Sequence, residues 1–472
     1  MQKALINIVN TINTYLSDYI LIILLVGVGL YFTIRTRFVQ IRCFGEGMKR
    51  VFGGFSFRGK KHGKSGMSSF QALATAISAQ VGTGNIVGAC GAILIGGPGA
   101  IFWMWVIAFF GMATIYAEAV LAQKTKVVSA DGEVIGGPVY YIREAFKGKF
   151  GKILAVCFSF CVILALGFMG AMVQSNSIGE ACNTAFGIPT WVCGLIVAVA
   201  AGLIFIGGIQ RIASVSEKIV PIMACLYLIG ALVVIGANIT RVPETFALIF
   251  KYAFQPNAII GGGIAYALKE AISQGAKRGL FSNEAGMGST PHAHAVAKVE
   301  KPHDQGVVAM IGVFIDTFIV LTLTALVVII TMYTDGAPLA DGYSGAITGV
   351  LTKTNLAQTA FGTVMGKTFG NAFVAICLLF FAFTTIVGWY FFGKQNMVYL
   401  FGKKSVVPYS IVCMIFIVLG SLASNDLVWG LTDMFNQLMV IPNVLALFAL
   451  GGVVALASKS ARKKKKDKDQ NE

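Results

Sequence analysis

Long apolar runs separated by short polar segments dominate the hydropathy pattern of this chain. A membrane-spanning helix needs about 20 mostly apolar residues, and eleven runs reach or approach that length. The predicted spans are 14–34, 70–95, 98–122, 151–178, 190–209, 217–238, 279–299, 307–333, 367–393, 405–423 and 427–457. The first run is too long for a cleaved signal peptide and is poorly followed by an A-x-A site, so it is kept as a span. The pattern predicts an all-α polytopic membrane protein.

Composition supports the same class. The 472 residues are 56% hydrophobic and only 12% charged, with a mean hydropathy of +0.77, whereas soluble domains carry about 25% charged residues. A soluble enzyme of this size could not hide so much apolar surface from water, so that class is excluded. The nine cysteines lie mostly inside apolar runs and form no CxxC pair. They are interpreted as small buried hydrophobic residues, without a disulfide framework or a metal site.

The basic residues predict the orientation of the spans. The net charge of +16 could suggest nucleic acid, but 29 of the 37 Lys and Arg residues lie in alternate gaps and in the C-terminal tail. Cytoplasmic loops carry this excess in membrane proteins. An outside N-terminus, eleven crossings and an inside C-terminus agree with it. The residues that fit poorly are Lys277 and Arg278, on the predicted outer side, while the run Lys463 to Lys466 suits contact with anionic membrane lipid.

Five segments divide the single membrane domain that the pattern predicts. They are an extra N-terminal helix with a basic cytoplasmic loop (1–69), a first five-helix repeat (70–238), an extracellular segment with a surface helix (239–278), a second five-helix repeat (279–457) and a basic cytoplasmic tail (458–472). The surface helix is expected at AYALKEAISQ, within the third segment.

Two weak spans contain the candidate chemistry. In the second span, Val81-Gly82-Thr83-Gly84-Asn85 interrupts a helical run, and unwinding there would free backbone N–H and C=O groups at mid-membrane depth. Such groups suit a substrate carboxylate and a bare cation respectively. A glycine hinge or close helix packing is the alternative. A dinucleotide loop is excluded by the glycine spacing and by the lack of a βαβ unit.

The seventh span repeats this device at Ser282 to Gly288, five spans later. Paired Gly-interrupted spans at corresponding positions are typical of transporters built from repeats. With five spans in each half, the two halves must be inverted in the membrane. The sequence therefore predicts a five-plus-five inverted repeat.

Other polar residues inside the apolar runs leave alternatives open. Asp316 is either linked to a cation or a hydrogen-bonding anchor. Glu118 and Asp433 lie nearer span ends, where capping or solvation is expected, and His292 and His294 are expected on a helix surface. No set of residues for nucleophilic catalysis and no ATP-binding loop is visible, so active transport would use an ion gradient.

At these motifs the chain resembles the alanine or glycine:cation symporter family of bacterial transporters. The matching strings are VGTGNIVG (81–88), GGPGAIFWMW (96–105), GGPVYYI (136–142) and RGLFSNEAGMGSTPHAHA (278–295). Their order and spacing cover about residues 70 to 450. The departures are Val139, where Met is common, and Thr290, where Ala is common.

The resemblance implies a leucine-transporter-type fold preceded by one extra helix, and sodium-coupled uptake of alanine or glycine. It implies that backbone N–H groups of the first break bind the substrate carboxylate and that hydroxyls and carbonyls bind sodium. The implied substrate-binding residues are Thr83, Gly84, Asn85, Gln174, Asn283, Thr385, Ile386 and Trp389. The implied cation-binding residues are Ser78, Val81, Asn85, Thr384 and Thr385. Asp316 is added to them as a candidate because it is a charge inside an apolar run.

Physical alternatives accompany two of these assignments. A large ring such as Trp389 would leave room for a methyl group at the side-chain end of a pocket, but it could also be an interfacial or packing residue. Thr384 and Thr385 could simply bond back to the preceding helical turn. The overall expectation is a sodium-coupled symporter of small neutral amino acids in the cell membrane, with no further cofactor, no other metal and no obligate protein partner. The alternatives are a proton-coupled carrier using Asp316 or Glu118 and, less favoured, a channel.

Overall fold

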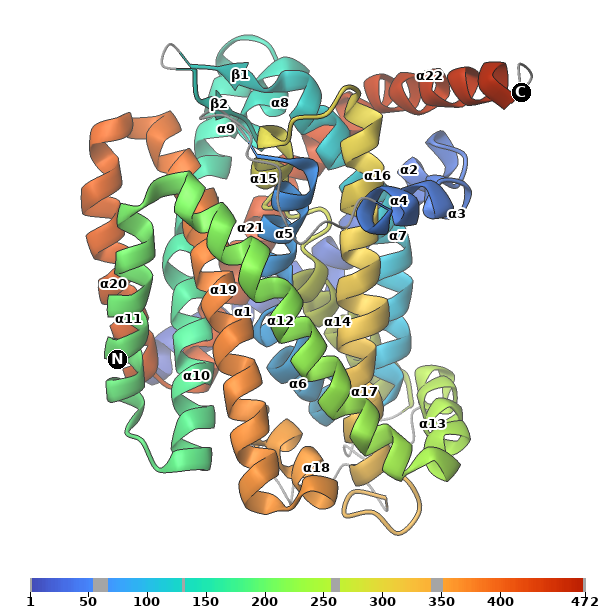
Figure 1. Ribbon diagram of the computed structural model, residues 1–472, viewed down its shortest axis with the longest axis vertical. Helices are drawn as coiled ribbons and strands as arrows, with labels where there is room; N and C mark the ends of the chain where they lie inside the picture. Colours follow the sequence, from blue (N-terminus) through green and yellow to red (C-terminus); the bar gives the residue numbers. More distant parts are fainter. Residues whose placement is uncertain (1, 54–66, 130–131, 256–263, 341–350, 470–472) are drawn as a thin grey trace.

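The structure is a computed structural model that describes residues 2–53, 67–129, 132–255, 264–340 and 351–469. Helices make up most of it, and the single two-stranded sheet among the described residues is a short antiparallel hairpin, β1 (Val127–Val128) with β2 (Val134–Ile135). The helices run mostly along the long axis of the molecule (Figure 1). The predicted all-α class is confirmed.

Eight of the described helical segments are long and apolar enough to cross a membrane. Several of them are continued through a short π-helical stretch. They are α1–η1–α2 (Gln2–Tyr15, Leu16–Leu21, Ile22–Arg35), α7 (Gly99–Thr125), α9–η3–α10 (Gly148–Val162, Ile163–Gly170, Ala171–Phe186), α12 (Gly208–Ala237), α16–η5–α17 (Pro302–Val313, Phe314–Leu321, Thr322–Met332), α19 (Lys367–Phe401), η7–α20 (Lys403–Ser405, Val406–Leu422) and α21 (Asn425–Ala449).

Three further predicted spans fall on helices with less regular features. The second is a bent pair, α5 (Ser69–Gln80) and η2–α6 (Gly84–Gly88, Ala89–Gly96), with 47° between its halves. The fifth is α11 (Thr190–Ile206), which is apolar but short. The seventh is α14 (Ile264–Asn283) followed by α15 (Pro291–Val296). By length and composition alone the described helices support eight or nine crossings, so the count of eleven and the role of an extra first helix remain predictions.

The remaining helices among the described residues lie toward the two ends of the bundle (Figure 1). They are α3 (Val39–Arg42), α4 (Phe44–Phe52), α8 (Pro138–Ala145), η4 (Ile239–Arg241), α13 (Val242–Phe254), α18 (Asn355–Met365) and α22 (Gly451–Asp469). The hairpin, α4, α8 and α22 gather at one end, whereas α13 and α18 lie at the other (Figure 1). Most of the basic gaps identified in the sequence belong to the first end.

The last predicted span ends earlier than expected. The sequence predicts it to residue 457, but α21 ends at Ala449 and α22 runs off sideways from the bundle (Figure 1). At this corner a Cβ on Gly451 would lie 2.2 Å from the Tyr31 hydroxyl. The chain therefore passes closely against Tyr31, and a larger residue at position 451 would require the Tyr31 side chain to shift. The predicted basic tail continues as helix to Asp469.

The predicted separate surface helix at AYALKEAISQ is the first half of α14. This helix runs unbroken into the seventh span, and small residues let it lie against α7. A Cβ on Gly275 would lie 2.5 Å from Trp103 Cβ, and a Cβ on Gly279 would be in ordinary contact with Ile107. Close packing along glycines therefore covers one face of a helix whose polar residues suggested a surface location.

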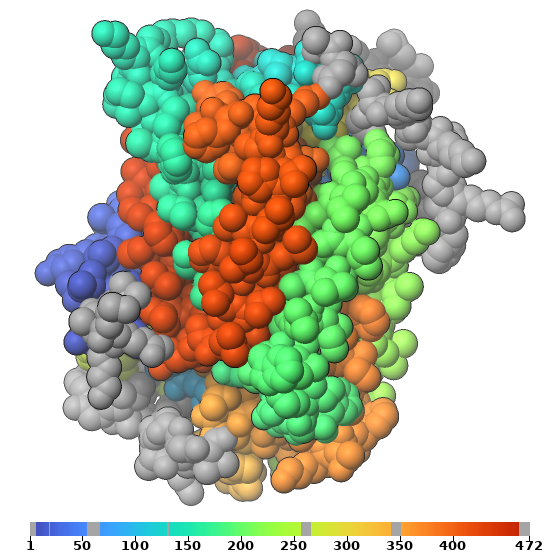
Figure 2. Space-filling view, turned by 90° about the vertical axis from the view of Figure 1, so that its left-hand side faces the viewer, coloured from blue at the N-terminus to red at the C-terminus, as the bar shows by residue number. Residues whose placement is uncertain are grey.

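The outer face of the bundle is apolar. Figure 2 shows one side, where α11 and α20 lie next to each other. Their outward side chains are large, apolar and exposed, and they include Leu195, Ile196, Val199, Leu203, Ile411, Ile415 and Leu419. Water would disfavour such a continuous surface, whereas lipid accepts it. The interior instead holds buried polar side chains, and several of them belong to the two helix breaks, including Thr83, Asn85, Ser282, Asn283 and Glu284.

Candidate functional site

The first break is a true interruption of helical hydrogen bonding. Val81 leaves the helical region, with φ −78° and ψ 85°. The next two N–H groups donate to side chains: Gly82 N–H to Asn85 Oδ1 at 3.0 Å, and Thr83 N–H to Gln174 Oε1 at 3.2 Å. In an uninterrupted helix these groups would bond to carbonyls four residues earlier. The predicted unwinding at this sequence is therefore present.

The carbonyls that lose those partners face Thr385. Its hydroxyl lies 3.0 Å from Ser78 O and 3.2 Å from Ala79 O, and also 3.1 Å from Phe381 O in its own helix. A Cβ on Gly82 would lie 2.3 Å from the Thr385 hydroxyl oxygen. Glycine at position 82 is thus what lets α19 approach the break closely enough to place one hydroxyl against two freed carbonyls.

Thr384 points elsewhere. Its hydroxyl donates back to the preceding turn, 3.0 Å from both Phe380 O and Phe381 O, and lies 3.5 Å from Met223 Sδ. This is the usual bonding of a threonine inside an apolar helix. The structure therefore brings Thr385, but not Thr384, to the oxygens around Ser78.

Two buried polar groups beside the first break have no protein partner among the described residues. They are the hydroxyl of Thr83 and the amide nitrogen of Gln174, both on fully buried side chains. Such groups are costly to leave unpaired in the interior. Their position next to the Thr83 N–H indicates a place where a polar ligand would bind.

Trp389 and Ile386 continue the α19 face that begins at Thr385, and both are buried. The Trp389 indole lies against Gly170, where a Cβ would be 2.3 Å from Cζ3, and the Phe281 ring meets it edge-on at 5.6 Å between centroids. Phe281 also packs against the first break, and it leaves little space for a side chain at position 84, because a Cβ on Gly84 would lie 3.0 Å from Phe281 Cδ1. Gly84 is therefore required at least for the close approach of α14.

The second break follows Asn283. Glu284 has φ 58°, Gly286 has φ 94° and Gly288 has φ 78°. Asn283 itself is buried and stabilises the break, since its Oδ1 accepts from Ala285 N–H at 3.0 Å. The left-handed region suits the two glycines but strains a glutamate. Residues held in this way often belong to functional sites.

Glu118 is buried against the second break. The expectation of a solvated position near a span end is wrong for this residue, which has no exposed surface, whereas the alternative of capping matches the bonds that it makes. Its carboxylate accepts from Gly286 N–H at 3.2 Å, Gly288 N–H at 3.0 Å and Asn443 Nδ2 at 2.6 Å. Glu118 therefore takes up N–H groups that the second break frees.

Asp316 joins the two breaks. Asn85 Nδ2 donates to its Oδ1 at 2.7 Å and to its main-chain carbonyl at 3.2 Å. The hydroxyls of Ser282 and Thr317 each lie 2.8 Å from Oδ2. A second link runs from Gln80 Nε2 to the Asn283 carbonyl at 2.7 Å. The anchoring role foreseen for Asp316 is present in the geometry, and the same oxygens could contact a cation.

Sequence reasoning missed Glu284 and Asn443 as members of this site. Glu284 Oε1 accepts from Trp389 Nε1 at 2.5 Å, and its Oε2 accepts from the Ser289 hydroxyl. Asn443 accepts from the Tyr141 hydroxyl and donates to Glu118. The signal for Glu284 was available, because it is an acidic residue inside a glycine-interrupted span. Asn443 carries no comparable local signal.

The predicted outer side holds a buried ion pair. Arg278 donates to Asp433 through two nitrogens, at 3.0 and 2.8 Å, and its guanidinium lies 4.6 Å from the Trp429 ring centroid. Asp433, expected near a span end and solvated, is only 7% exposed, which corrects that expectation. The pairing also explains how Arg278 is accommodated despite fitting the charge pattern poorly.

The two histidines after the second break are buried, not on a helix surface as expected. His292 Nδ1 lies 2.7 Å from Ser289 O, and its Nε2 lies 2.9 Å from Asn396 Nδ2. His294 Nδ1 lies 2.8 Å from Gln305 Nε2. The helix-surface reading fails because α15 is enclosed by α5, α7 and α19.

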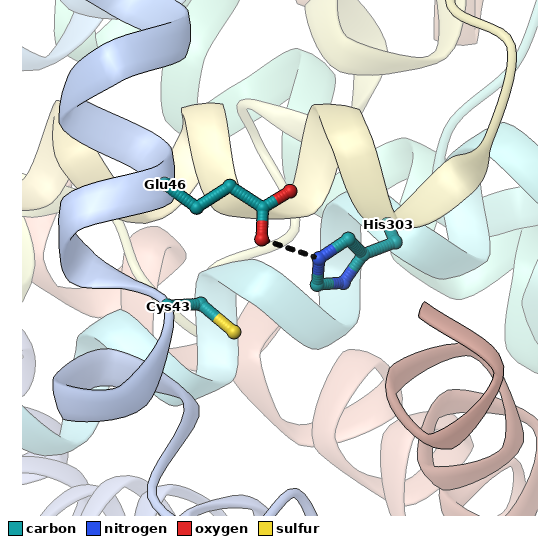
Figure 3. Close-up of side chains that lie close together, drawn as sticks. All are labelled: Cys43, Glu46 and His303. Carbon is teal, nitrogen blue, oxygen red and sulfur yellow. Dashed lines mark ion pairs between the residues drawn. The ribbon is translucent and has the colours of Figure 1, made fainter. Parts of the chain in front are cut away.

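A separate cluster of Cys43, Glu46 and His303 lies where α4 meets α16 (Figure 3). His303 Nε2 is 3.5 Å from Glu46 Oε2, while Arg50 contacts Glu46 Oε1 at 3.0 Å. Hydrogen bonding by His303, aided by Arg50, lowers the pKa of the Glu46 carboxyl from 4.5 to about 2. Both carboxylate oxygens therefore have partners within the protein, and the cluster is explained as an ion pair between two helices.

Comparison with known proteins agrees with this architecture. The sequence model of the sodium:alanine symporter family matches residues 2–472. The sodium/alanine symporter AgcS of Methanococcus maripaludis is 39% identical over 467 residues, which cover 99% of each chain. The probable sodium/glutamine symporter GlnT of Bacillus subtilis is 40% identical over 472 residues, covering 99% of this chain and 93% of its own.

Solved structures identify the fold. The crystal structure of MhsT in complex with L-phenylalanine matches with a TM-score of 0.57 and 13% identity, over 84% of this chain and 98% of that one. The predicted leucine-transporter-type fold is confirmed. The relatives are secondary transporters of the membrane and not enzymes. Because the family match runs over nearly the whole chain, this protein belongs to the sodium:alanine symporter family.

Proposed function

We propose that this transporter carries small neutral amino acids, alanine or glycine, into the cell together with sodium. Two features of the first break support the proposal. Polar groups of Thr83 and Gln174 have no partner among the described residues, and two carbonyls freed from the helix face the Thr385 hydroxyl. One set suits an amino acid and the other a bare cation. The names of the relatives, a sodium/alanine symporter and a probable sodium/glutamine symporter, support this class of substrate.

The substrate carboxylate would take the N–H groups of Thr83 and Gly84, beside Asn85. In the structure Gln174 Oε1 accepts from Thr83 N–H, so the arriving carboxylate would displace it. The released Gln174 oxygen could then accept from the substrate ammonium group. Asn283, Thr385, Ile386 and Trp389 would surround the remaining atoms, with the indole limiting the length of the side chain.

Sodium would bind where the Thr385 hydroxyl meets the carbonyls of Ser78 and Ala79. The Thr385 hydroxyl lies within hydrogen-bonding distance of both carbonyl oxygens. A cation there would draw on hydroxyl and carbonyl oxygens, with Val81 as a further candidate. Hard cations prefer such oxygen ligands. Thr384 is not supported as a ligand, because its hydroxyl bonds to its own helix. Asn85 and Asp316 form the other candidate cation site.

Proton coupling is the second candidate, and the hydrogen bonds favour one carboxylate over the other. Glu118 accepts three hydrogen bonds from N–H donors. A protonated carboxyl must donate a hydrogen bond, and none of these three nitrogens could accept it. Asp316 Oδ2 faces two hydroxyls, from Ser282 and Thr317, and either could accept. A proton-coupled carrier would therefore use Asp316 rather than Glu118.

Transport would proceed by alternating access of one repeat against the other around these fixed sites. The end that holds the hairpin, α8 and α22 would face the cytoplasm, because the basic gaps gather there. In that proposed orientation the N-terminus would lie outside and the C-terminus inside. Single cysteines introduced at Lys403 and at Lys367 and probed with an impermeant thiol reagent would test it, since only Lys367→Cys should react from outside.

Labelled alanine uptake into proteoliposomes tests the proposed function. Gradients of sodium, lithium and protons are imposed one at a time, and competition by a panel of amino acids gives the selectivity. Saturable accumulation driven by sodium alone is expected. Accumulation driven by a proton gradient without sodium would favour the second candidate, and equilibration without accumulation would favour a channel.

A further inference from the structure

Glu284 occupies an unusual position in the second break. It is fully buried, its φ of 58° lies in the left-handed region, and no ion pair among the described residues includes it. Its two carboxylate oxygens instead accept from Trp389 Nε1, at 2.5 Å, and from the Ser289 hydroxyl. A buried acidic residue is costly inside a membrane protein and is usually retained for a functional reason.

The partner of Glu284 is a ring whose other contacts are apolar. Trp389 lies against Gly170 on one side and meets the edge of Phe281 on another. Neither contact offers the indole N–H an acceptor, and a buried indole N–H normally has one. The hydrogen bond to Glu284 therefore fixes the rotation of the indole through its single polar group, the N–H.

The two residues belong to different parts of the fold. Trp389 lies one turn beyond Thr385 on α19, whereas Glu284 lies at the start of the second break, 105 positions earlier in the chain. The hydrogen bond thus connects the second broken span directly to the α19 face that approaches the first. A movement of Glu284 at the second break would therefore change the orientation of the indole.

We propose that Glu284 is a positioning residue that fixes the Trp389 indole across the side-chain end of the amino-acid pocket, and thereby determines the size of side chain that is carried. This inference rests on the proposed function, in which Trp389 lines that pocket. Glu284 itself does not contact the substrate. Its effect passes through the orientation of one ring.

Three variants separate this role from a merely structural one. Glu284→Gln keeps an oxygen that can accept from the indole N–H and an amide that can donate to Ser289, so it should preserve the selectivity. Glu284→Ala removes the acceptor, and Trp389→Phe removes the N–H while keeping an aromatic ring. All substitutions at position 284 keep a Cβ, so the backbone strain at positive φ is the same in each.

The main measurement is the uptake of valine relative to alanine at saturating sodium. Discrimination of one methylene group or more is worth about tenfold or above, so Glu284→Ala should raise this ratio by about that factor. The sodium concentration for half-maximal uptake should not change. The partly exposed Glu133→Gln, which removes a carboxylate that pairs with Lys403 at 3.4 Å, is the control.

A double-mutant cycle tests whether the effect passes through the indole N–H. In a Trp389→Phe background, Glu284→Ala should change the valine to alanine ratio little further. An equal change in both backgrounds would overturn the inference, as would loss of selectivity in Glu284→Gln equal to that in Glu284→Ala.

Fluorescence provides a readout that does not depend on transport. The emission of Trp389 is obtained as the difference between each protein and its Trp389→Phe counterpart, and it should shift in Glu284→Ala but not in Glu284→Gln. An unshifted emission in Glu284→Ala would overturn the positioning role. Wild-type protein that takes up no alanine would overturn the proposed function, and the emission result would still judge the positioning of Trp389.

Discussion

Asn85 of the first break and Asp316 of η5 are joined by one short hydrogen bond. Asn85 Nδ2 in the first break donates to Asp316 Oδ1 at 2.7 Å, while Ser282 near the end of α14 donates to the other oxygen at 2.8 Å. A single carboxylate thus holds residues from both broken spans. Binding of an ion beside Asp316 would therefore depend on the positions of both broken spans.

Asp316→Asn is expected to weaken alanine uptake while leaving its dependence on sodium in place. Hydrogen bonds to charged groups contribute about 1.5–3 kcal/mol, and the amide loses their charge-assisted part, so an increase of about tenfold in the alanine concentration for half-maximal uptake should follow. Uptake is measured against sodium at fixed pH. A variant that also loses a response to the proton gradient seen in wild-type protein would instead support proton coupling at Asp316.

The adjacent threonines of α19 offer a matched pair of variants. Thr385→Val deletes the hydroxyl that faces the carbonyls of Ser78 and Ala79, whereas Thr384→Val deletes one that bonds back to its own helix. Losing one sodium ligand should raise the sodium concentration for half-maximal uptake by about tenfold. By linkage, alanine binding should weaken at low sodium and much less at saturating sodium.

The control for that experiment is Thr384→Val, which should leave the sodium curve near that of wild-type protein. Both substitutions preserve shape and remove one hydroxyl. Equal sodium curves for Thr385→Val and wild-type protein would remove the site beneath Thr385 from the mechanism. A shift confined to Thr384→Val would place the cation on the other face of α19.

Gly82→Ala is expected to abolish transport. Its Cβ would lie 2.3 Å from the Thr385 hydroxyl oxygen and 3.3 Å from Gln174 Oε1, so α19 would be pushed away from the break. Gly27→Ala, where a Cβ would meet nothing within 4 Å, is the control. Uptake of alanine and binding of sodium are both measured, after size-exclusion chromatography has shown that each variant is folded. Normal uptake by Gly82→Ala would mean that the close approach of α19 is dispensable.

The ion pair between α4 and α16 predicts a loss of stability in acid. The pKa of Glu46 is depressed, from 4.5 to about 2, so its contribution is present above the pKa of the unfolded chain and is lost as the pH falls through 4.5 toward 2. Glu46→Gln lacks this contribution at every pH. The difference in melting temperature between wild-type and variant protein should therefore shrink between pH 6 and pH 3, and a constant difference would contradict the assignment.

Much of this protein could be predicted from local sequence. Apolar runs of the right length dictate helices in lipid, because only internally bonded backbone is stable there. The glycine and polar residues at 81–85 and 282–288 predict where two of those helices cannot continue. The charge pattern predicts that the basic segments between spans lie on one side of the membrane. The described elements place most of these segments at one end of the bundle.

Other features were decided only by packing between distant segments. Nothing local distinguishes Thr384 from Thr385, yet successive residues on a helix point about 100° apart, so one faces the break and its neighbour does not. Arg278 does not fit the charge pattern of the sequence. The fold explains its position, because it brings Asp433, 155 positions away, into an ion pair with it. Glu118 was assigned to a span end because the sequence does not show that α7 passes the second break.

The same reason explains why Glu284 and Asn443 were overlooked. Apolarity and helix breaking are properties of a few neighbouring residues, so the sequence determines where helices form and where they stop. The partner of a buried polar group is determined by which helices lie side by side and how each is rotated. The hydrogen bond from Trp389 to Glu284 depends on both, and only the tertiary structure brings those two residues together.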